Sequence, residues 1–273
     1  MGIKRVITAV VFIPLFYFLV KYLPPVFFFL FVATGIVIGL YEFYRFHYGP
    51  VPSPSIRLGL ILGALVAAGF YRHDLIEGSL LMIGTVFIIL LFHLFFSGNL
   101  ASSLIDSSVV LFGLAYVAWF LGYLILIRGF EDGGRAIFFL FLVTWAGDTG
   151  AYYVGKSIGR HKLSPVVSPN KTIEGLVGGI LTSMMVALLA RAWFFPALSR
   201  RECLVLGSLF GIIGQIGDLA ESMLKRSAGI KDSGSIIPAH GGLLDRADSL
   251  IFTAPVFYYY LVLVKGYGHA ILI

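Results

Sequence analysis

Long apolar runs alternate with short polar stretches along the whole chain. Nine apolar segments can be distinguished, and they lie near residues 6–20, 25–44, 58–71, 80–96, 109–127, 136–154, 175–195, 204–223 and 247–264. A helix needs about 20 predominantly apolar residues to cross a bilayer. Runs such as LLMIGTVFIILLFHLFF do not alternate between apolar and polar positions, as the strands of a membrane barrel do. The pattern predicts an all-α, polytopic integral membrane protein with about nine transmembrane helices. Because the third segment is short, eight spans and a re-entrant piece remain the alternative.

The composition agrees with this prediction. Of 273 residues, 59% are hydrophobic and only 12% are charged, whereas a soluble domain is about half apolar and about a quarter charged. The first segment follows a basic start and so resembles a signal peptide. The residues that follow it are Lys21, Tyr22, Leu23 and two prolines, not the small residues of a cleavage site. We therefore interpret it as a retained first span.

The lysines and arginines indicate an orientation for the nine spans. Twelve of the 20 fall on the side of the N-terminus. Loops rich in these residues face the cytoplasm, which predicts a cell-membrane protein with a cytoplasmic N-terminus and an external C-terminus. The same loops explain the pI near 9.4, so the basic balance does not call for a nucleic-acid partner.

Five acidic residues in the second half of the chain are singled out because they lie within or at the ends of the predicted spans. Carboxylates are unfavourable in hydrocarbon, so each requires a partner or a function. All five lie toward the cytoplasmic side, on three different spans: Asp148, Asp218, Glu221, Asp245 and Asp248.

Three interpretations of these acids compete. They could pair with neighbouring cations and hold helices together. For Glu221, this structural role and a functional role are equally well supported by the sequence. The acids could form an ion pathway. They could also hold a hard cation, since oxygen ligands from several helices suit Mg²⁺. Asp245 and Asp248, one turn apart at a helix start, are the strongest metal pair. The lone Cys203 and His240 supply no zinc ligand set.

Two polar segments flank the acids on the same side. One covers residues 222–249 and carries Lys225, Arg226, Lys231 and Arg246; the other covers residues 155–175. Carboxylates beside cations and glycines suit phosphoryl or nucleotidyl transfer, although no P-loop motif is present. Basic loops that merely face the cytoplasm are the alternative.

The second of these segments carries local signals of its own. Ser168-Pro169 indicates a turn, and Thr172 is placed to cap the following helix.

The order of polar residues in residues 222–249 closely resembles the motif of the phosphatidate cytidylyltransferases, or CDP-diacylglycerol synthases. The matching residues are Ser222, Lys225-Arg226, Lys231-Asp232, Gly234, Pro238, His240-Gly241-Gly242 and Asp245-Arg246-x-Asp248. Residues 155–175, together with Asp148, resemble the upstream block of the same family. Asn170 stands where a lysine is common, and Ala247 where a larger apolar residue is usual. The resemblance covers about residues 145 to 250.

The resemblance implies a reaction and a division of the chain. CTP and phosphatidic acid would give CDP-diacylglycerol and pyrophosphate, with Mg²⁺ as one or two ions and a second, monovalent cation as an option. It also implies a homodimer in the lipid bilayer. Residues 1–135 would be N-terminal spans, 136–264 the catalytic membrane region facing the cytoplasm, and 265–273 a short tail.

The resemblance also assigns roles to residues. The metal ligands would be Asp218, Asp245 and Asp248, which would act in catalysis with Lys225 and Arg226. The substrate-binding residues would be Lys171, Ser222, Lys231, His240, Gly241, Gly242, Arg246 and Asp148.

Two rival functions remain to be weighed. A CDP-alcohol phosphotransferase also uses Mg²⁺ and lipid phosphates, but its DGxxAR…GxxxDxxxD pattern is absent. A cation transporter or channel would carry acids deep in its spans and internal repeats. Here the polar residues gather in two long loops on one side, which favours a reaction with a soluble substrate.

Overall fold

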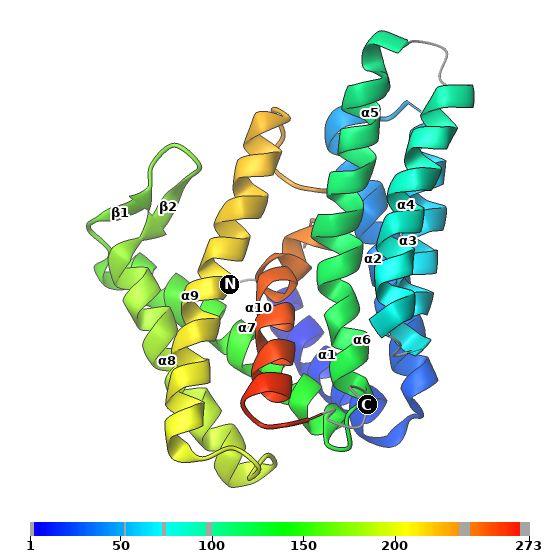
Figure 1. Cartoon of the computed structure of the whole chain (residues 1–273). Helices are drawn as coiled ribbons and strands as arrows, with labels where there is room; N and C mark the ends of the chain where they lie inside the picture. The colour runs from blue at the N-terminus through cyan, green and yellow to red at the C-terminus, as the bar shows by residue number, and fades with distance from the viewer. Residues whose placement is uncertain (1–2, 52, 73–74, 97–99, 235–240, 268–273) are drawn as a thin grey trace.

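The computed structural model describes residues 3–51, 53–72, 75–96, 100–234 and 241–267, and helices dominate it (Figure 1). The first half of the chain contains α1 (Ile3–Tyr22), α2 (Pro25–Tyr48), α3 (Pro54–Arg72), α4 (Leu75–Phe96), α5 (Leu100–Gly113) and α6 (Phe120–Gly129). A π-helical turn, Leu114–Trp119, joins α5 to α6 without a break. The second half contains α7 (Gly133–Ile158), β1 (Lys162–Ser164), β2 (Ser168–Thr172), α8 (Ile173–Trp193), α9 (Arg200–Ser227) and α10 (Leu244–Leu263).

The predicted all-α class is confirmed, apart from one small hairpin. Each of the nine predicted apolar segments overlaps a helix, with α5, its π-turn and α6 together forming the fifth. Most helix ends lie within about five residues of the predicted ends, but the fifth begins at Leu100, nine residues before its predicted start. Among the residues that the structure describes, six helices are long and apolar enough to cross a membrane. A membrane protein is thereby supported, while the number of nine spans stays a prediction.

The polar segment 155–175 folds into the hairpin of β1 and β2, which pair antiparallel. Its turn is formed by residues 165–167, and Ser168-Pro169 begins β2. The predicted turn at Ser168-Pro169 is therefore wrong; Pro169 is accommodated in the strand because a two-stranded ladder leaves many N–H groups without a required partner. The predicted cap is confirmed, because Thr172 Oγ1 accepts a hydrogen bond of 3.1 Å from the Gly175 N–H.

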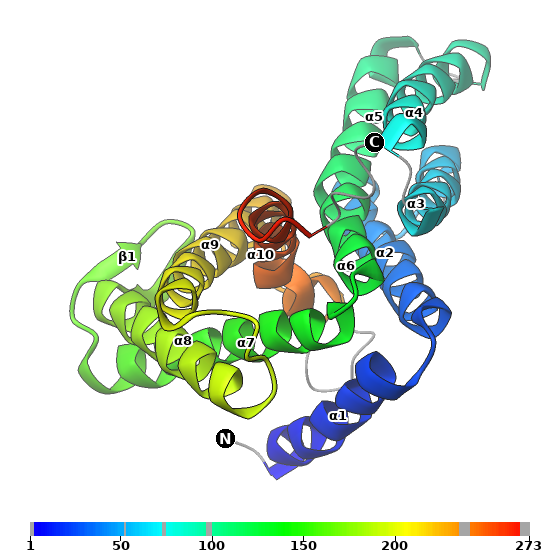
Figure 2. The same ribbon diagram turned by 60° about the horizontal axis from the view of Figure 1, so that its bottom comes forward.

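The helices form two neighbouring groups (Figure 2). In one, α8 packs between α7 and α9; in the other, α2 packs against α3 and α6. α10 contacts both groups, because it packs on α9 and on α6. This position allows α10 to combine residues from the two halves of the chain.

Glycines bring α8 and α9 unusually close together. A Cβ built on Gly207 would lie 2.6 Å from Met184 Cα, and one on Gly211 would lie 2.8 Å from Ile180 Cα. No larger residue fits at Gly207 or Gly211 unless the backbone of α8 moves, so these glycines allow the two helices to pack closely.

Both polar segments lie at the same end of the bundle. Figure 1 shows the β1–β2 hairpin and the end of α9 at the top, and the connection from α8 to α9 and the end of α10 at the bottom. The site described next lies toward that upper end.

Candidate active site

Three carboxylates from α9 and α10 come together. Asp218, Glu221 and Asp248 each offer an oxygen atom, and these atoms lie within 4.8 Å of one another. Glu221 is fully buried, and its Oε1 atom has no hydrogen-bond partner among the described residues. Like charges at this distance repel one another. An unpartnered buried carboxylate oxygen beside two other carboxylates therefore fits a bound cation, and oxygen ligands suit Mg²⁺.

A cavity of about 530 Å³ adjoins this group. Its walls come from α7, β2, α8 and α9, and its lining residues are Asp148, Ala151, Tyr152, Gly155, Lys156, Ser168, Asn170, Lys171, Thr172, Gly175, Gln215 and Asp218. Asp218 belongs both to the cavity wall and to the acidic group. A ligand in the cavity would therefore lie directly beside a cation held by the three acids.

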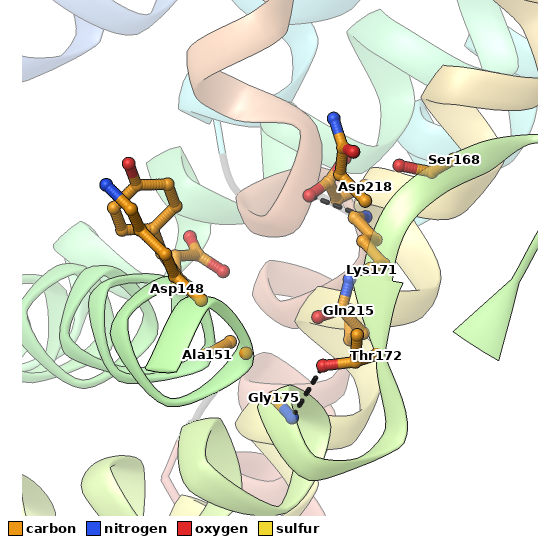
Figure 3. A pocket seen from close by; sticks show the side chains of 12 residues that line it. Asp148, Ala151, Ser168, Lys171, Thr172, Gly175, Gln215 and Asp218 are labelled. Carbon is orange, nitrogen blue, oxygen red and sulfur yellow. Dashed lines mark hydrogen bonds and ion pairs between the residues drawn. The ribbon is translucent and has the colours of Figure 1, made fainter. Parts of the chain in front are cut away.

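The cavity contains both signs of charge. Lys171 Nζ on β2 forms an ion pair of 2.6 Å with Asp218. Figure 3 shows Asp148 on α7 facing this pair from the opposite wall. The Ser249 hydroxyl of α10 donates to Asp148 Oδ1 at 3.3 Å. The cavity thus brings together Asp148, Lys171 and Asp218, three residues to which the family resemblance assigns substrate or metal binding; these roles stay predictions.

Lys225 links the acidic group to the loop before α10. Its Nζ atom lies 2.7 Å from Glu221 Oε2 and 2.5 Å from Asp245 Oδ1. Asp245 Oδ2 also accepts hydrogen bonds from the N–H groups of Gly242, at 2.8 Å, and Ser233, at 3.0 Å. Both Asp245 oxygens are thus engaged with the chain itself, and a role of Asp245 as metal ligand stays a prediction.

Glu42, near the end of α2, is a residue that the sequence analysis missed. Its side chain is only 2% exposed and accepts hydrogen bonds from the N–H groups of Leu243 and Leu244, at 3.0 and 2.8 Å. The Ser233 hydroxyl donates to it at 3.2 Å. Glu42 lies inside the predicted second span, so the reasoning applied to the other intramembrane acids would have found it.

The remaining predicted residues lie around this centre. The Ser222 hydroxyl donates to Asp218 at 3.4 Å. Gly241 has a φ of +81°, a backbone conformation that favours glycine. Arg226 is exposed and donates to the Ile230 carbonyl at 3.0 Å. Lys231 and Arg246 are exposed, and His240 lies outside the described residues.

Gln215 was also missed by the sequence analysis. It lies three residues before Asp218 on α9 and lines the cavity with it. A single amide in an apolar helix was the available signal, but the sequence alone does not say whether such an amide faces a neighbouring helix or a ligand.

Apolar helices, a partly buried group of acids and a cavity with paired charges define a polytopic membrane protein with a site suited to phosphate groups and a metal ion. The chain belongs to the cytidylyltransferase family, whose sequence profile matches residues 3–264.

Several curated relatives carry the name phosphatidate cytidylyltransferase. The protein of Staphylococcus saprophyticus is 40% identical over 207 residues, which cover 76% of this chain and 77% of the relative. That of Staphylococcus epidermidis is 44% identical over 154 residues, which cover 56% of this chain and 58% of the relative. That of Staphylococcus aureus is 43% identical over 156 residues, with the same two shares.

Proposed function

We propose that the protein is a Mg²⁺-dependent phosphatidate cytidylyltransferase, which converts CTP and phosphatidic acid to CDP-diacylglycerol and pyrophosphate. Family membership and the names of the relatives support this proposal. The structural observation that carries it is the group of Asp218, Glu221 and Asp248 at the wall of the cavity that contains Lys171.

The reaction needs charge neutralisation more than a protein base. A phosphate oxygen of phosphatidic acid attacks the α-phosphorus of CTP, and the bond from that phosphorus to the bridging oxygen breaks to release pyrophosphate. A phosphate monoester has a second pKa near 6 and is already largely dianionic at neutral pH. No proton has to be removed from the nucleophile, so the residues must bring two anions together and stabilise the departing one.

The described residues supply groups for both tasks. Asp218, Glu221 and Asp248 would hold Mg²⁺, which supplies charge stabilisation for the phosphoryl oxygens. Lys171 would contact substrate phosphate in the cavity, since its ion pair with Asp218 is partly exposed and can exchange partners. Lys225 keeps two neighbouring carboxylates in fixed positions.

The proposed setting is the cell membrane. Nine spans, with the N-terminus and both polar segments in the cytoplasm, bring CTP from water and phosphatidic acid from the bilayer to one site. The twelve-to-eight distribution of lysines and arginines supports this orientation. A homodimer is the assembly that we expect from the family resemblance.

The test is a direct assay. Purified protein is given phosphatidic acid in detergent, Mg²⁺ and each nucleoside triphosphate in turn, and pyrophosphate and the lipid product are measured. CTP should give CDP-diacylglycerol, and chelation of Mg²⁺ should abolish its formation. An absence of CTP-dependent product from folded protein would refute the proposal.

A further inference from the structure

The Glu42 carboxylate is enclosed by the loop that leads into α10. Its Oε1 atom accepts from the Leu243 N–H, and its Oε2 atom accepts from the Leu244 N–H and from the Ser233 hydroxyl. The N–H groups at a helix start have no partner inside the helix, and the helix dipole favours a negative charge there. Glu42 therefore caps α10 from a different helix, about 200 residues away in the sequence.

The loop backbone leaves no room around this carboxylate. A Cβ built on Gly234 would lie 2.6 Å from Glu42 Oε1, and one built on Gly242 would lie 2.6 Å from Glu42 Oε2. Two of the motif glycines thus allow the backbone to close on the acid of α2. Their presence is explained by this contact as well as by any contact with a substrate.

The same contacts lead to the acids of α10. Ser233, which donates to Glu42, also accepts a hydrogen bond of 3.3 Å from the Asp245 N–H, while its own N–H donates to the Asp245 carboxylate. Leu244 directly precedes Asp245, and Asp248 lies one turn further along α10. Because Glu42 accepts from the first N–H groups of α10, it fixes the rotation of the start of this helix, which carries Asp245 and Asp248.

We propose that Glu42 is a positioning residue that holds the start of α10 so that Asp248 meets Asp218 and Glu221. The proposal rests on the proposed function for its kinetic consequences, but not for its structural ones. It assigns a part of the reaction to the N-terminal spans, which the family motif does not include. The competing possibility is a cap that stabilises the fold and leaves the acids where they are.

Glu42→Gln is the informative variant, because it keeps the size of the side chain and removes its charge. Glu202→Gln is the matched control. Glu202 also caps a helix, since it accepts from the Ser199 N–H at 2.6 Å, and it binds the Tyr260 hydroxyl at 2.9 Å. It lies at the start of α9, at the opposite end of the bundle from the acidic group.

Two measurements separate positioning from stability. The first measurement is kcat as a function of Mg²⁺ concentration. In Glu42→Gln we expect kcat to fall about tenfold and half-maximal activity to require severalfold more Mg²⁺, because the charge-assisted hydrogen bonds to the start of α10 are weakened. The second is amide hydrogen exchange of residues 241–249, which should accelerate in Glu42→Gln and not in Glu202→Gln. Thermal unfolding of both variants serves as the common reference.

The outcomes distinguish the proposals. Activity of Glu42→Gln within about twofold of the unmodified protein, or unchanged exchange in residues 241–249, would overturn the positioning role. So would a loss of activity that Glu202→Gln reproduces at the same thermal stability. If the unmodified protein makes no CDP-diacylglycerol, the proposed function fails, while the exchange measurement still decides the role of Glu42.

Discussion

Lys225 is the residue on which the charges of the site converge. Its buried ammonium group contacts Glu221 and Asp245, and Lys171 contacts Asp218. Asp248 accepts a hydrogen bond of 2.6 Å from the Ser249 N–H, and one of its carboxylate oxygens lies within 4.8 Å of oxygens of Asp218 and Glu221. The site thus carries an excess of negative charge next to the cavity, and a metal ion would relieve it.

Asp248→Asn and Asp218→Asn should each lower kcat at least about 100-fold, because a charge contact made in the transition state is worth about 3 kcal/mol. We expect the same loss for Asp245→Asn, with lower thermal stability in addition, since this carboxylate also holds Ser233 and Gly242. Steady-state kinetics and thermal unfolding provide the measurements. Asp132→Asn is the control, because Asp132 lies at the start of α7, away from the site, where it forms an ion pair of 2.9 Å with the exposed Arg135. Near-normal turnover of a site variant would assign that residue a structural role.

Lys225 and Lys231 should respond differently to replacement by alanine. Removal of Lys225 leaves two carboxylates without their common partner, so we expect a fall in kcat and a loss of about 3 kcal/mol of stability, the usual result of breaking a buried ion pair. Lys231 is exposed in the loop, and its replacement should mainly raise KM for CTP.

CTP titrations at saturating phosphatidic acid would check this difference. An unchanged kcat in Lys225→Ala would remove Lys225 from the reaction. We expect Arg226→Ala to lower kcat as well. The alternative is a role at the membrane surface, because Arg226 is exposed and donates to the Ile230 carbonyl. An effect on lipid saturation alone would make Arg226 a membrane-surface anchor.

At the level of the helices, glycine determines how closely α9 and α10 approach. A Cβ on Gly217 would lie 2.5 Å from the Asp248 carbonyl oxygen. Glycines recur every third residue at 211, 214 and 217, a spacing that favours close helix packing. The spacing alone does not say which helix approaches, because that depends on the position of α10 between the two groups of helices.

Gly217→Ala should therefore push α10 away from α9 and separate Asp248 from Asp218. We expect a lower kcat and a Mg²⁺ requirement raised about tenfold or more, as for a disturbed metal site. Gly84→Ala is the control, because a Cβ on Gly84 meets nothing within 4 Å. The measurement is activity as a function of Mg²⁺ concentration. If Gly217→Ala has the Mg²⁺ dependence of Gly84→Ala, the close approach is not needed for the site.

For the whole molecule, the sequence predicted the helices and the acids around the cavity, but not the contacts that hold the start of α10. Apolar segments are read from composition alone, and Asp148, Asp218 and Asp248 stood out as acids in apolar surroundings. The contacts of Glu42 with the loop before α10 could not be predicted, because they join residues about 200 positions apart. The division of carboxylates between a metal and Lys225 likewise depends on distances that only the folded chain supplies.

The predicted topology can be tested at the hairpin. Val166 is 90% exposed in the turn between β1 and β2, so a reporter inserted there should not disturb the helices. It should report a cytoplasmic location, and a reporter after Ile273 should report the opposite side. A reporter in the connection between α8 and α9 should agree with the C-terminal one. The same signal from the hairpin and the C-terminus would refute nine spans.

The cap on α10 changes what counts as a separable module. Residues 1–135 and 136–264 look like an anchor and an enzyme when only the motif is considered, yet the acid of α2 and glycines 234 and 242 fit one another within a few ångströms. If the first spans are exchanged between relatives, the residues at all three positions must therefore be exchanged at the same time. In evolutionary terms, the anchor and the enzyme would be expected to vary as one inherited unit, because the contact that joins them needs residues from both.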